Sequence, residues 1–475
     1  MSVPAHLSRR SFLCQSLAAA GLLAGAPAAL LAVPPLQVAN VTGLYTVQVA
    51  RIAVPTSVME LAAQTIAWRG QVAVGGGRYS MGGQVAIEGG LHVDMRRMNA
   101  LLWVRPAQRM VRVQAGMRWR DLQDVLDPLG LAVETMQSYS NFSIGGSVSV
   151  NAHGRYVGNG PVGNSVTALQ LMLVDGSLVE ATPHNNTELF RAAIGGYGAL
   201  AVITEVELRL ARNEKIERRV DRMPLQDYLA FFDAQVAADS AAILHNADLA
   251  PPLFDAPVAV TWRRSDKALT EPARLVPRGV DYAKERTALW AMTELPKGSK
   301  LRQAVVDPLV YGKQAVVWRN HEASLDVAQL EPRSRRQSTY VLQEYFIPRR
   351  RFESFARQMG PLLQRRQVEA VNVSVRHSPA DAVALLPWAR EEVFSFVLYY
   401  KQRTDDAAMA AVGEWTRELV ELALLHEGRY YLPYQMHASR EQFDRAYPEA
   451  AGLRALKQRV DPAGKFSNSL WRKYL

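Results

Sequence analysis

The stretch VAVGGGRYSMGG, residues 72 to 83, constrains the fold of this chain more than any other segment. It holds five glycines in the nine positions from Gly75 to Gly83, directly after an apolar run that favours a β-strand. Glycine lets the backbone adopt positive φ and lets another group come close to the main chain. Successive N–H groups in such a loop form a concave nest that binds phosphate without any charged side chain. The stretch therefore indicates either a pyrophosphate site or a tight turn between two strands.

Two well-known phosphate loops do not fit this stretch. A P-loop needs GKS or GKT after its glycines, and the sequence has neither there. A Rossmann fingerprint opens a helix whose N-terminus faces the pyrophosphate. The segment that follows, QVAIEGGLHVDMRRM, alternates in polarity and is interrupted by Gly89 and Gly90. It is predicted to be strand or loop, so the glycine loop is of another kind.

Two further glycine clusters follow in the same part of the chain. Gly145 and Gly146 precede the run Asn151-Ala152-His153-Gly154, and Gly195, Gly196 and Gly198 precede an alternating, strand-like segment at 199 to 211. Three glycine clusters within one unit favour a long ligand that lies along several loops, such as a dinucleotide.

The order of predicted elements indicates an α+β protein with more than one unit. A length of 475 residues, of which 48% are hydrophobic, allows two or more globular cores. Residues 40 to 212 alternate short strands and helices, with a helix at 53 to 67, a strand at 110 to 116 and a hairpin that turns at Asp175-Gly176. Residues 213 to 425 contain strand-like segments at 338 to 348, 370 to 379 and 392 to 402 and a helix at 407 to 425.

The N-terminus has the layout of an export signal. The twin arginines Arg9 and Arg10 precede an apolar run rich in Ala and Leu, so residues 1 to 32 are predicted to be a twin-arginine signal and the protein is expected in the periplasm. The alternative is an uncleaved membrane anchor, because the apolar run is near the length that spans a bilayer. The only cysteine, Cys14, lies inside this signal. The mature protein is therefore expected to have neither a disulfide nor a thiolate site.

Charge and motifs narrow the classes of function. The formal net charge of +10 is compatible with anionic substrates or a peripheral contact with a membrane. The arginine clusters at 333 to 336 and 348 to 351 lack the interleaved aromatics of a nucleic-acid module, so no nucleic acid is expected as a partner. The sequence has no HExxH, no GxSxG and no metal-ligand spacing of His with carboxylates, so no metal site is predicted.

The motifs VGGGRYSMGG, NAHG, GGYGALAVIT and a late DPAGKFSN occur in an order that resembles the flavoproteins of the vanillyl-alcohol oxidase and p-cresol methylhydroxylase (PCMH) superfamily. The pattern is nearest to sugar-lactone and alditol oxidases and to decaprenylphosphoryl-ribose oxidases. The resemblance implies a two-lobed, PCMH-type fold: an FAD-binding domain at 40 to 212, a cap domain at 213 to 425 and a C-terminal segment, 426 to 475, that completes the active site. It implies that FAD is bound by Gly75, Gly76, Gly77, Arg78, Tyr79, Ser80, Met81, Gly82, Gly145, Gly146, Ser147, Asn151, His153, Gly154, Gly198, Val202, Ile203 and Asn468.

The resemblance also bears on how FAD is held. In members that resemble sugar and alditol oxidases, the matching loop carries a histidine that is bonded covalently to the flavin. Tyr79 stands at that place here, before Ser80. With no cysteine in the mature chain, and with His153 matching a loop histidine that has a packing role, non-covalent FAD is expected.

Oxidation of an alcohol by a flavin needs a hydride-donating carbon near the flavin and a base for the hydroxyl proton. By resemblance, Tyr431 matches an active-site tyrosine, and Tyr434 stands where a lysine is found in relatives. The lysine's role is then either lost or taken by Tyr434 or His437. Glu344 matches a glutamine that a cap strand presents to the substrate, and it is a candidate proton acceptor.

A second cap strand, NVSVRHSP, corresponds to an alditol-oxidase strand that carries a glutamate and an arginine. Arg376 matches the arginine and is expected to orient the substrate, whereas Ser374 occupies the position of the glutamate. Strand alternation places His377 on the opposite face.

These features predict an exported FAD-dependent oxidoreductase. It is expected to oxidise a CH–OH group of a polyol, sugar or sugar lactone and to pass the electrons to O2 or another acceptor. One alternative is a flavin reductase or dehydrogenase fed by a redox partner. Another is a non-catalytic periplasmic binding protein in which the glycines only make turns.

Overall fold

The computed structural model describes residues 36–294, 307–312, 314–332 and 334–475. The expected export signal at 1 to 32 and Arg333 of the first arginine cluster lie outside the described residues. The described residues belong to one compact unit, Leu36–Leu475. The expected boundary at residue 212 falls at the short link between strands β11 (Val202–Arg212) and β12 (Lys215–Arg222), and the domain boundaries stay a prediction. Within the described ranges, no helix combines the length and apolar character needed to cross a bilayer.

The first glycine loop follows a small parallel sheet in the order β3-β5-β4. Helix α1 begins after Ser57, whose side chain accepts a hydrogen bond from the Glu60 N–H, as an N-cap does. The helix predicted at 53 to 67 is therefore confirmed from residue 58 onward. The bounds are β3 Arg51–Ala53, α1 Val58–Ala67, β4 Val72–Gly75 and β5 Leu91–Asp94, preceded by the hairpin of β1 Leu36–Ala39 and β2 Thr46–Val49.

A second sheet, in the order β10-β9-β11-β7-β6, supports the other two glycine clusters. Its β9–β10 hairpin turns at Gly176, whose φ of 83° explains the glycine. Strand β11 alternates as the sequence predicted, with Val206, Leu208 and Leu210 buried. The bounds are β6 Leu101–Arg105, β7 Met110–Gln114, α2 Trp119–Leu126, β8 Leu131–Val133, α3 Ile144–Ser149, β9 Val166–Met172, β10 Leu178–Ala181 and α4 Thr187–Ala193.

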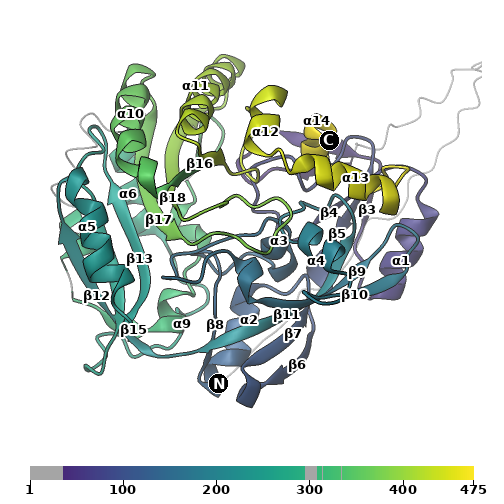
Figure 1. Ribbon diagram of the computed structural model, residues 1–475, viewed down its shortest axis with the longest axis horizontal. Helices are drawn as coiled ribbons and strands as arrows, with labels where there is room; N and C mark the ends of the chain where they lie inside the picture. The colour runs from purple at the N-terminus through teal and green to yellow at the C-terminus, as the bar shows by residue number, and fades with distance from the viewer. Residues whose placement is uncertain (1–35, 295–306, 313, 333) are drawn as a thin grey trace, which may run out of the picture. The chain divides into compact units, whose positions relative to one another are not determined.

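The cap part is built on an eight-stranded antiparallel sheet in the order β15-β12-β14-β13-β17-β18-β16-β19. Helices α10 and α11 lie together beside strands β16 to β18 (Figure 1). The strands are β13 Ala242–Leu249, β14 Val258–Arg264, β15 Val316–Trp318, β16 Ser338–Pro348, β17 Glu369–Ser378, β18 Val393–Arg403 and β19 Arg429–Tyr430. The helices are α5 Tyr228–Phe232, α6 Ala283–Glu294, α8 Asp307–Tyr311, α9 Arg319–Glu322, α10 Phe352–Arg365 and α11 Asp406–Leu425.

Alternation along the central strands of this sheet separates core from site. Val373 and Val375 on β17, and Phe396 and Leu398 on β18, are fully buried in the core that helices α10 and α11 complete. Because successive side chains point to opposite faces of a strand, the residues between them are turned to the other face. That other face is the wall of the cavity described below.

The C-terminal segment returns to the first part of the chain. Phe466 forms a parallel bridge with Val72, next to the glycine loop, and the yellow helices lie beside the purple N-terminal elements in Figure 1. These helices are α12 Arg440–Ala446, α13 Ala450–Val460 and α14 Ser469–Tyr474. The expected α+β class with a returning C-terminal segment is confirmed.

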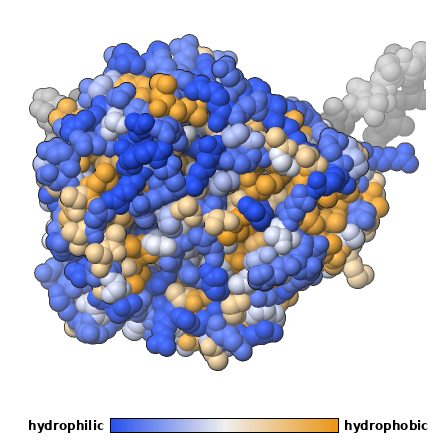
Figure 2. Space-filling view, in the orientation of Figure 1, coloured by the Kyte–Doolittle hydropathy of each residue, from blue (hydrophilic) through white to orange (hydrophobic). Residues whose placement is uncertain are grey.

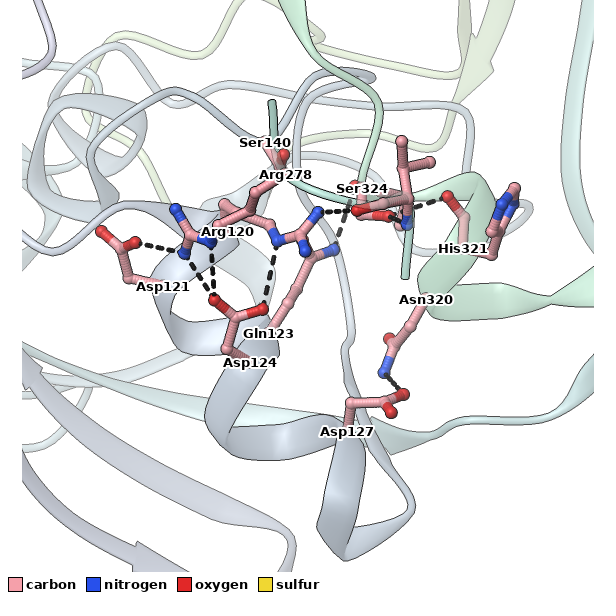
Figure 3. Close-up of polar contacts among 12 residues, drawn as sticks. Arg120, Asp121, Gln123, Asp124, Asp127, Ser140, Arg278, Asn320, His321 and Ser324 are labelled. Atoms are coloured by element: carbon pink, nitrogen blue, oxygen red, sulfur yellow. Dashed lines mark hydrogen bonds and ion pairs between the residues drawn. The ribbon is translucent and has the colours of Figure 1, made fainter. Parts of the chain in front are cut away.

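A polar junction joins helix α2 to the cap part (Figure 3). Arg278 contacts Asp121 and Asp124 of α2, and Gln123 Nε2 donates to the Ala323 carbonyl at 3.0 Å. The neighbouring Ser140 N–H donates to the Leu325 carbonyl at 2.9 Å. This junction fixes the loop just before the second glycine cluster, and that loop lines the cavity.

One face of the molecule is drawn in space-filling form in Figure 2. Figure 2 shows that this face of the molecule is mainly hydrophilic, with scattered apolar patches. Scattered exposed apolar residues are normal for a folded protein and need no partner.

Candidate active site

One cavity of about 470 Å³ lies where the three glycine clusters, the cap sheet and the C-terminal segment meet. Its lining includes Gly76 and Gly77 of the first cluster, Gly145 and Gly146 of the second and Gly198 of the third. The three clusters, which the sequence only suggested belong together, thus share one cavity. That arrangement suits a long ligand.

The first half of the glycine loop faces the second cluster. A Cβ at Gly76 would overlap Ser143 Oγ, and the Gly77 N–H donates to the same oxygen at 2.9 Å. Arg78 adopts a positive φ of 60° and lines the cavity, 3.7 Å from Asp94. Bare backbone and a guanidinium therefore lie side by side, as a cradle for a diphosphate requires.

The second half of the glycine loop has a different role. A Cβ at Gly82 would lie 2.5 Å from the Tyr434 carbonyl oxygen, and one at Gly83 would lie 2.6 Å from Met436 Sδ. The Met81 N–H donates to the Pro433 carbonyl at 2.9 Å. Gly82 does not line the cavity, although Tyr79, Ser80 and Met81 do. These two glycines allow the C-terminal segment to pack against the loop.

The second cluster opens a short helix and not a loop. Gly145 and Gly146 lie in the first turn of α3, and a Cβ at Gly145 would lie 2.5 Å from Ala115 Cβ. Ser147 lines the cavity while its Oγ bonds to Trp119 and Gln137, each at 2.9 Å. The expected run of loop beside the flavin is therefore helical at its start.

Several predicted cofactor residues act from behind the cavity and do not line it. Asn151 Nδ2 donates to Asp381 at 2.8 Å and fixes the NAHG turn, and Asn468 Nδ2 donates to the Tyr197 carbonyl at 2.7 Å and holds the third cluster. Gly75, Gly82, Gly154, Asn151 and Asn468 are outside the lining, whereas Gly76, Gly77, Arg78, Tyr79, Ser80, Met81, Gly145, Gly146, Ser147, His153, Gly198, Val202 and Ile203 are in it.

One row of the cap sheet forms the opposite wall. Asp248 on β13, Ser374 on β17, Val397 on β18 and Glu344 on β16 are successive partners in the ladder, and all four line the cavity. Arg376 lies two residues along β17 from Ser374 and lines it as well. The alternation predicted for β17 is confirmed, because His377 faces away and contacts Glu392 at 2.8 Å.

Glu344 is the centre of a buried polar group. Its Oε1 lies 2.5 Å from His153 Nε2, and the Tyr434 hydroxyl donates to its Oε2 at 3.3 Å. Burial by itself raises the pKa of the Glu344 carboxyl, but its interactions with His153 and Arg376 outweigh burial and hold that pKa below its usual value. The site therefore presents an ionised carboxylate to the cavity.

The pKa of the Tyr434 hydroxyl is shifted in the opposite direction, upward. Burial and the neighbouring Glu344 carboxylate raise the pKa of the Tyr434 hydroxyl well above its usual value. The hydroxyl stays protonated and serves as a hydrogen-bond donor. This separates the two candidate acid-base groups into an acceptor, Glu344, and a donor, Tyr434.

The Arg376 side chain reaches the cavity with unused hydrogen-bonding capacity. Its Nε is buried without a hydrogen-bond partner, and within the described part of the chain its guanidinium makes no ion pair. Burial lowers the pKa of Arg376 although the Glu344 carboxylate opposes this. A guanidinium that is buried, charged and unpaired in a cavity is suited to an oxygen of a ligand.

Of the two remaining predicted residues, Tyr431 lines the cavity and His437 does not. Tyr431 lines the cavity, but its hydroxyl already donates to the Val150 carbonyl at 2.7 Å, so it forms a wall. His437 is outside the lining, and its Nε2 lies 2.8 Å from Gln435 Oε1. Burial lowers the pKa of His437 to about 4. Tyr139, Asn246, Asp248 and Asn372 also line the cavity and were not predicted. Asn246 and Asp248 carry only the alternation of β13 as a signal, Asn372 only that of β17, and Tyr139 lies in a loop whose sequence has no such signal.

The residues that line the cavity fit FAD. Glycine backbone and Arg78 suit a diphosphate, and the apolar part of the lining suits a ring system. Among the residues that the structure describes, no group of three or more His, Cys, Asp or Glu side chains is placed to hold a metal ion.

Comparisons with known proteins agree with this geometry. Residues 49–182 match the FAD binding domain family, and residues 256–474 match the D-arabinono-1,4-lactone oxidase family. L-gulonolactone oxidase of Mus musculus is 24% identical over 433 residues, which cover 88% of this chain and 93% of the relative. Alditol oxidase of Streptomyces sp. is 26% identical over 378 residues, or 77% and 81% of the two chains.

Two further relatives are also named as oxidases. Decaprenylphosphoryl-β-D-ribose oxidase of Mycolicibacterium smegmatis is 23% identical over 435 residues, or 85% and 89% of the two chains. D-arabinono-1,4-lactone oxidase of Yarrowia lipolytica is 36% identical over only 99 residues, 21% of this chain and 19% of the relative. The two matched domains and the full-length relatives confirm the expected resemblance and the expected cofactor. The chain is an FAD-dependent oxidoreductase that resembles the PCMH-type superfamily, with a match to an FAD binding domain followed by a match to D-arabinono-1,4-lactone oxidase.

Proposed function

We propose that this protein oxidises a CH–OH group of a polyol, sugar or sugar lactone. Relatives named as lactone oxidases and an alditol oxidase support a sugar-like substrate. The observation that carries the proposal is the buried group on the cap wall: the Glu344 carboxylate with His153 and Tyr434 around it, and the unpaired Arg376 beside it.

The roles of these side chains follow from their contacts. Bound FAD would supply the two-electron acceptor for the hydride of the substrate carbon. Arg376 binds the substrate oxygen and stabilises the negative charge that grows on it as the proton leaves. Glu344 Oε2 accepts that proton, because the pKa of Glu344 keeps it ionised. His153 holds Oε1 in place and Tyr434 donates to Oε2, so the carboxylate has one orientation.

The test uses the purified flavoprotein without oxygen. Polyols and sugar lactones are added and bleaching of the flavin absorbance is followed. Glu344→Gln should slow bleaching by about 10²-fold or more, as loss of a general base does. Glu392→Gln is the matched control: it alters a second His–Glu contact of the same sheet, that with His377, outside the cavity. Equal rates in both variants would remove Glu344 from the reaction.

We infer that FAD is held without a covalent bond. Tyr79 packs edge-on against Phe142 at 5.1 Å, and both ring nitrogens of His153 are engaged, by Glu344 and by the Gly154 carbonyl. Neither side chain is then free to form a tether. Acid precipitation should release the yellow chromophore into the supernatant, and chromophore retained in the pellet would contradict the inference.

We also propose export through the twin-arginine signal at 1 to 32 and a periplasmic location, with O2 or another molecule as electron acceptor. Arg9, Arg10 and the apolar run that follows support the signal. Replacing both arginines by lysine should leave the protein in the cytoplasmic fraction. Recovery of the wild type in membranes would favour the uncleaved anchor, and the reaction of the reduced flavin with O2 in stopped flow separates an oxidase from a dehydrogenase.

A further inference from the structure

The cavity extends past Arg376 to a second polar end on strands β13 and β17. Asp248 and Glu344 lie in the same row of the sheet, in the order β13-β17-β18-β16. Three interstrand spacings of about 4.8 Å therefore put roughly 14 Å between the two positions. The proposed reaction uses only the Glu344 end.

The contacts of Asp248 leave it able to bind a ligand. Its Oδ1 accepts from Asn372 Nδ2 at 2.9 Å, and its Oδ2 accepts from the Tyr311 hydroxyl at 2.7 Å. A carboxylate has about four acceptor sites. Asn246 Nδ2 also donates to Oδ1, at 3.5 Å. Oδ2 therefore keeps one acceptor site for a further donor, while the three protein contacts fix the direction in which the carboxylate points.

The loop opposite adds a free hydroxyl. Tyr139 lines the cavity, and no hydrogen bond to its hydroxyl is found within the part of the chain that the structure describes. Burial raises the pKa of Tyr139, although the charges of Arg155 and Arg376 oppose this, so the hydroxyl stays a donor. Arg376, Glu344 and Tyr139 line the same cavity. Unsatisfied polar groups that face a cavity from both walls point to a polar ligand.

The chemistry of this end matches hydroxyl groups. A carboxylate accepts from an alcohol O–H, and amide and phenol groups both donate and accept. An extended six-carbon chain with its two terminal oxygens spans about 8.9 Å from its bond lengths, and a hydrogen bond of about 2.8 Å at each end brings the reach to roughly 14 Å. The reach of a four-carbon chain, calculated in the same way, is shorter by about 2.6 Å.

We propose that Asp248, Asn372 and Tyr139 form a distal subsite. It binds hydroxyl groups remote from the oxidised carbon and selects polyhydroxylated substrates of about six carbons over shorter ones. This inference rests on the proposed function, since it names the substrate length that the same cavity accepts.

The test compares chain lengths on the flavin-loaded enzyme. Erythritol, xylitol and sorbitol are each mixed without oxygen, and the rate of flavin bleaching is measured against polyol concentration. Asp248→Asn should lower the efficiency for sorbitol by about ten- to a hundredfold, the size expected for hydrogen bonds to a charged group, and should leave that for erythritol within about twofold. Tyr139→Phe, which removes one hydroxyl only, should show the same dependence on length to a smaller degree.

A control variant separates a loss specific to the distal subsite from a general effect of the substitution on the sheet. Asp221→Asn makes the same chemical change on β12 of the same sheet, outside the cavity, and should leave all three polyols unaffected. Equal losses for short and long polyols, or no loss for any, would overturn the subsite while the proposed function stands. Failure of every polyol and lactone to bleach the wild-type flavin would overturn both.

Discussion

Lys457 ties the C-terminal segment to the third glycine cluster, and replacing it should loosen both. Its ammonium donates to the carbonyls of Ala199 and Phe466, each at 2.7 Å, and to the Asp461 carboxylate at 2.9 Å. The Asp461 side chain is 0% exposed and that of Lys457 is 13% exposed. The contact is therefore a buried ion pair with two buried carbonyls around it.

The expected cost of Lys457→Met follows from these partners. Removing one partner of a buried pair costs about 3–5 kcal/mol, and each buried carbonyl left without a donor costs about 1–3 kcal/mol. Asp461 keeps two hydrogen bonds, from the N–H groups of Lys465 and Phe466 at 2.8 Å, which favours the low end. The low ends of these three costs add up to a loss of roughly 5 kcal/mol in the free energy of unfolding.

The variant should also bind FAD more weakly. Ala199 lines the cavity beside Gly198, so a loop without its tie has more conformations to lose on binding. We expect affinity to fall by about tenfold, which corresponds to about 1.4 kcal/mol. Urea unfolding and titration of the apoprotein with FAD measure the two effects.

Arg459→Met, on the same helix, is the matched control. Arg459 pairs with Glu188, and their side chains are 57% and 61% exposed. Exposed pairs are worth about 0–1 kcal/mol, so this variant should lose little stability and no FAD affinity. If both variants lose the same stability, the reasoning about the buried tie is wrong.

Three further predictions concern the site and its glycines. Tyr434→Phe removes the hydrogen bond to Glu344, and should lower the rate of flavin reduction by substrate about three- to tenfold while FAD stays bound; an unchanged rate would exclude a role for the hydroxyl. The pKa of Glu344 is held below its usual 4.5, so activity should be full above that pH and lost only as pH falls through the lower, folded-state pKa; the stability that the ionised group contributes should be lost over the same range, and an acid limb near neutrality would refute the assignment. Gly82→Ala meets the Tyr434 carbonyl and should destabilise by about 1–3 kcal/mol. Gly452→Ala on helix α13 would place its Cβ in ordinary contact with Leu385 Cδ1, at 3.9 Å, and should stabilise by about 0.5–1 kcal/mol; thermal unfolding measures both effects.

Local patterns in the sequence were enough to predict most elements and to show which residues of β17 share a face. The alternation of β17 correctly separated Arg376 from His377, and the turn at Asp175-Gly176 was correctly placed. Period-two alternation is a local property, so one strand reveals which residues share a face.

Pairing between distant residues could not be predicted in this way. His153 and Glu344 are 191 residues apart and meet only because the NAHG turn and β16 are brought together by the fold. Gly82 was assigned to the cofactor because the sequence does not show that the C-terminal segment packs on it. His437 was assigned to the site from its nearness to Tyr434, but its side chain faces Gln435 and Gly413.

The alternation of β17 has a consequence for how substrate range can change. Ser374 and Arg376 face the cavity, while Val373 and Val375, their neighbours, hold the sheet to its helices. A substitution on one face leaves the contacts of the other in place. Mutational libraries confined to alternate positions of this strand should therefore yield folded enzymes with new specificities far more often than libraries spread over consecutive positions.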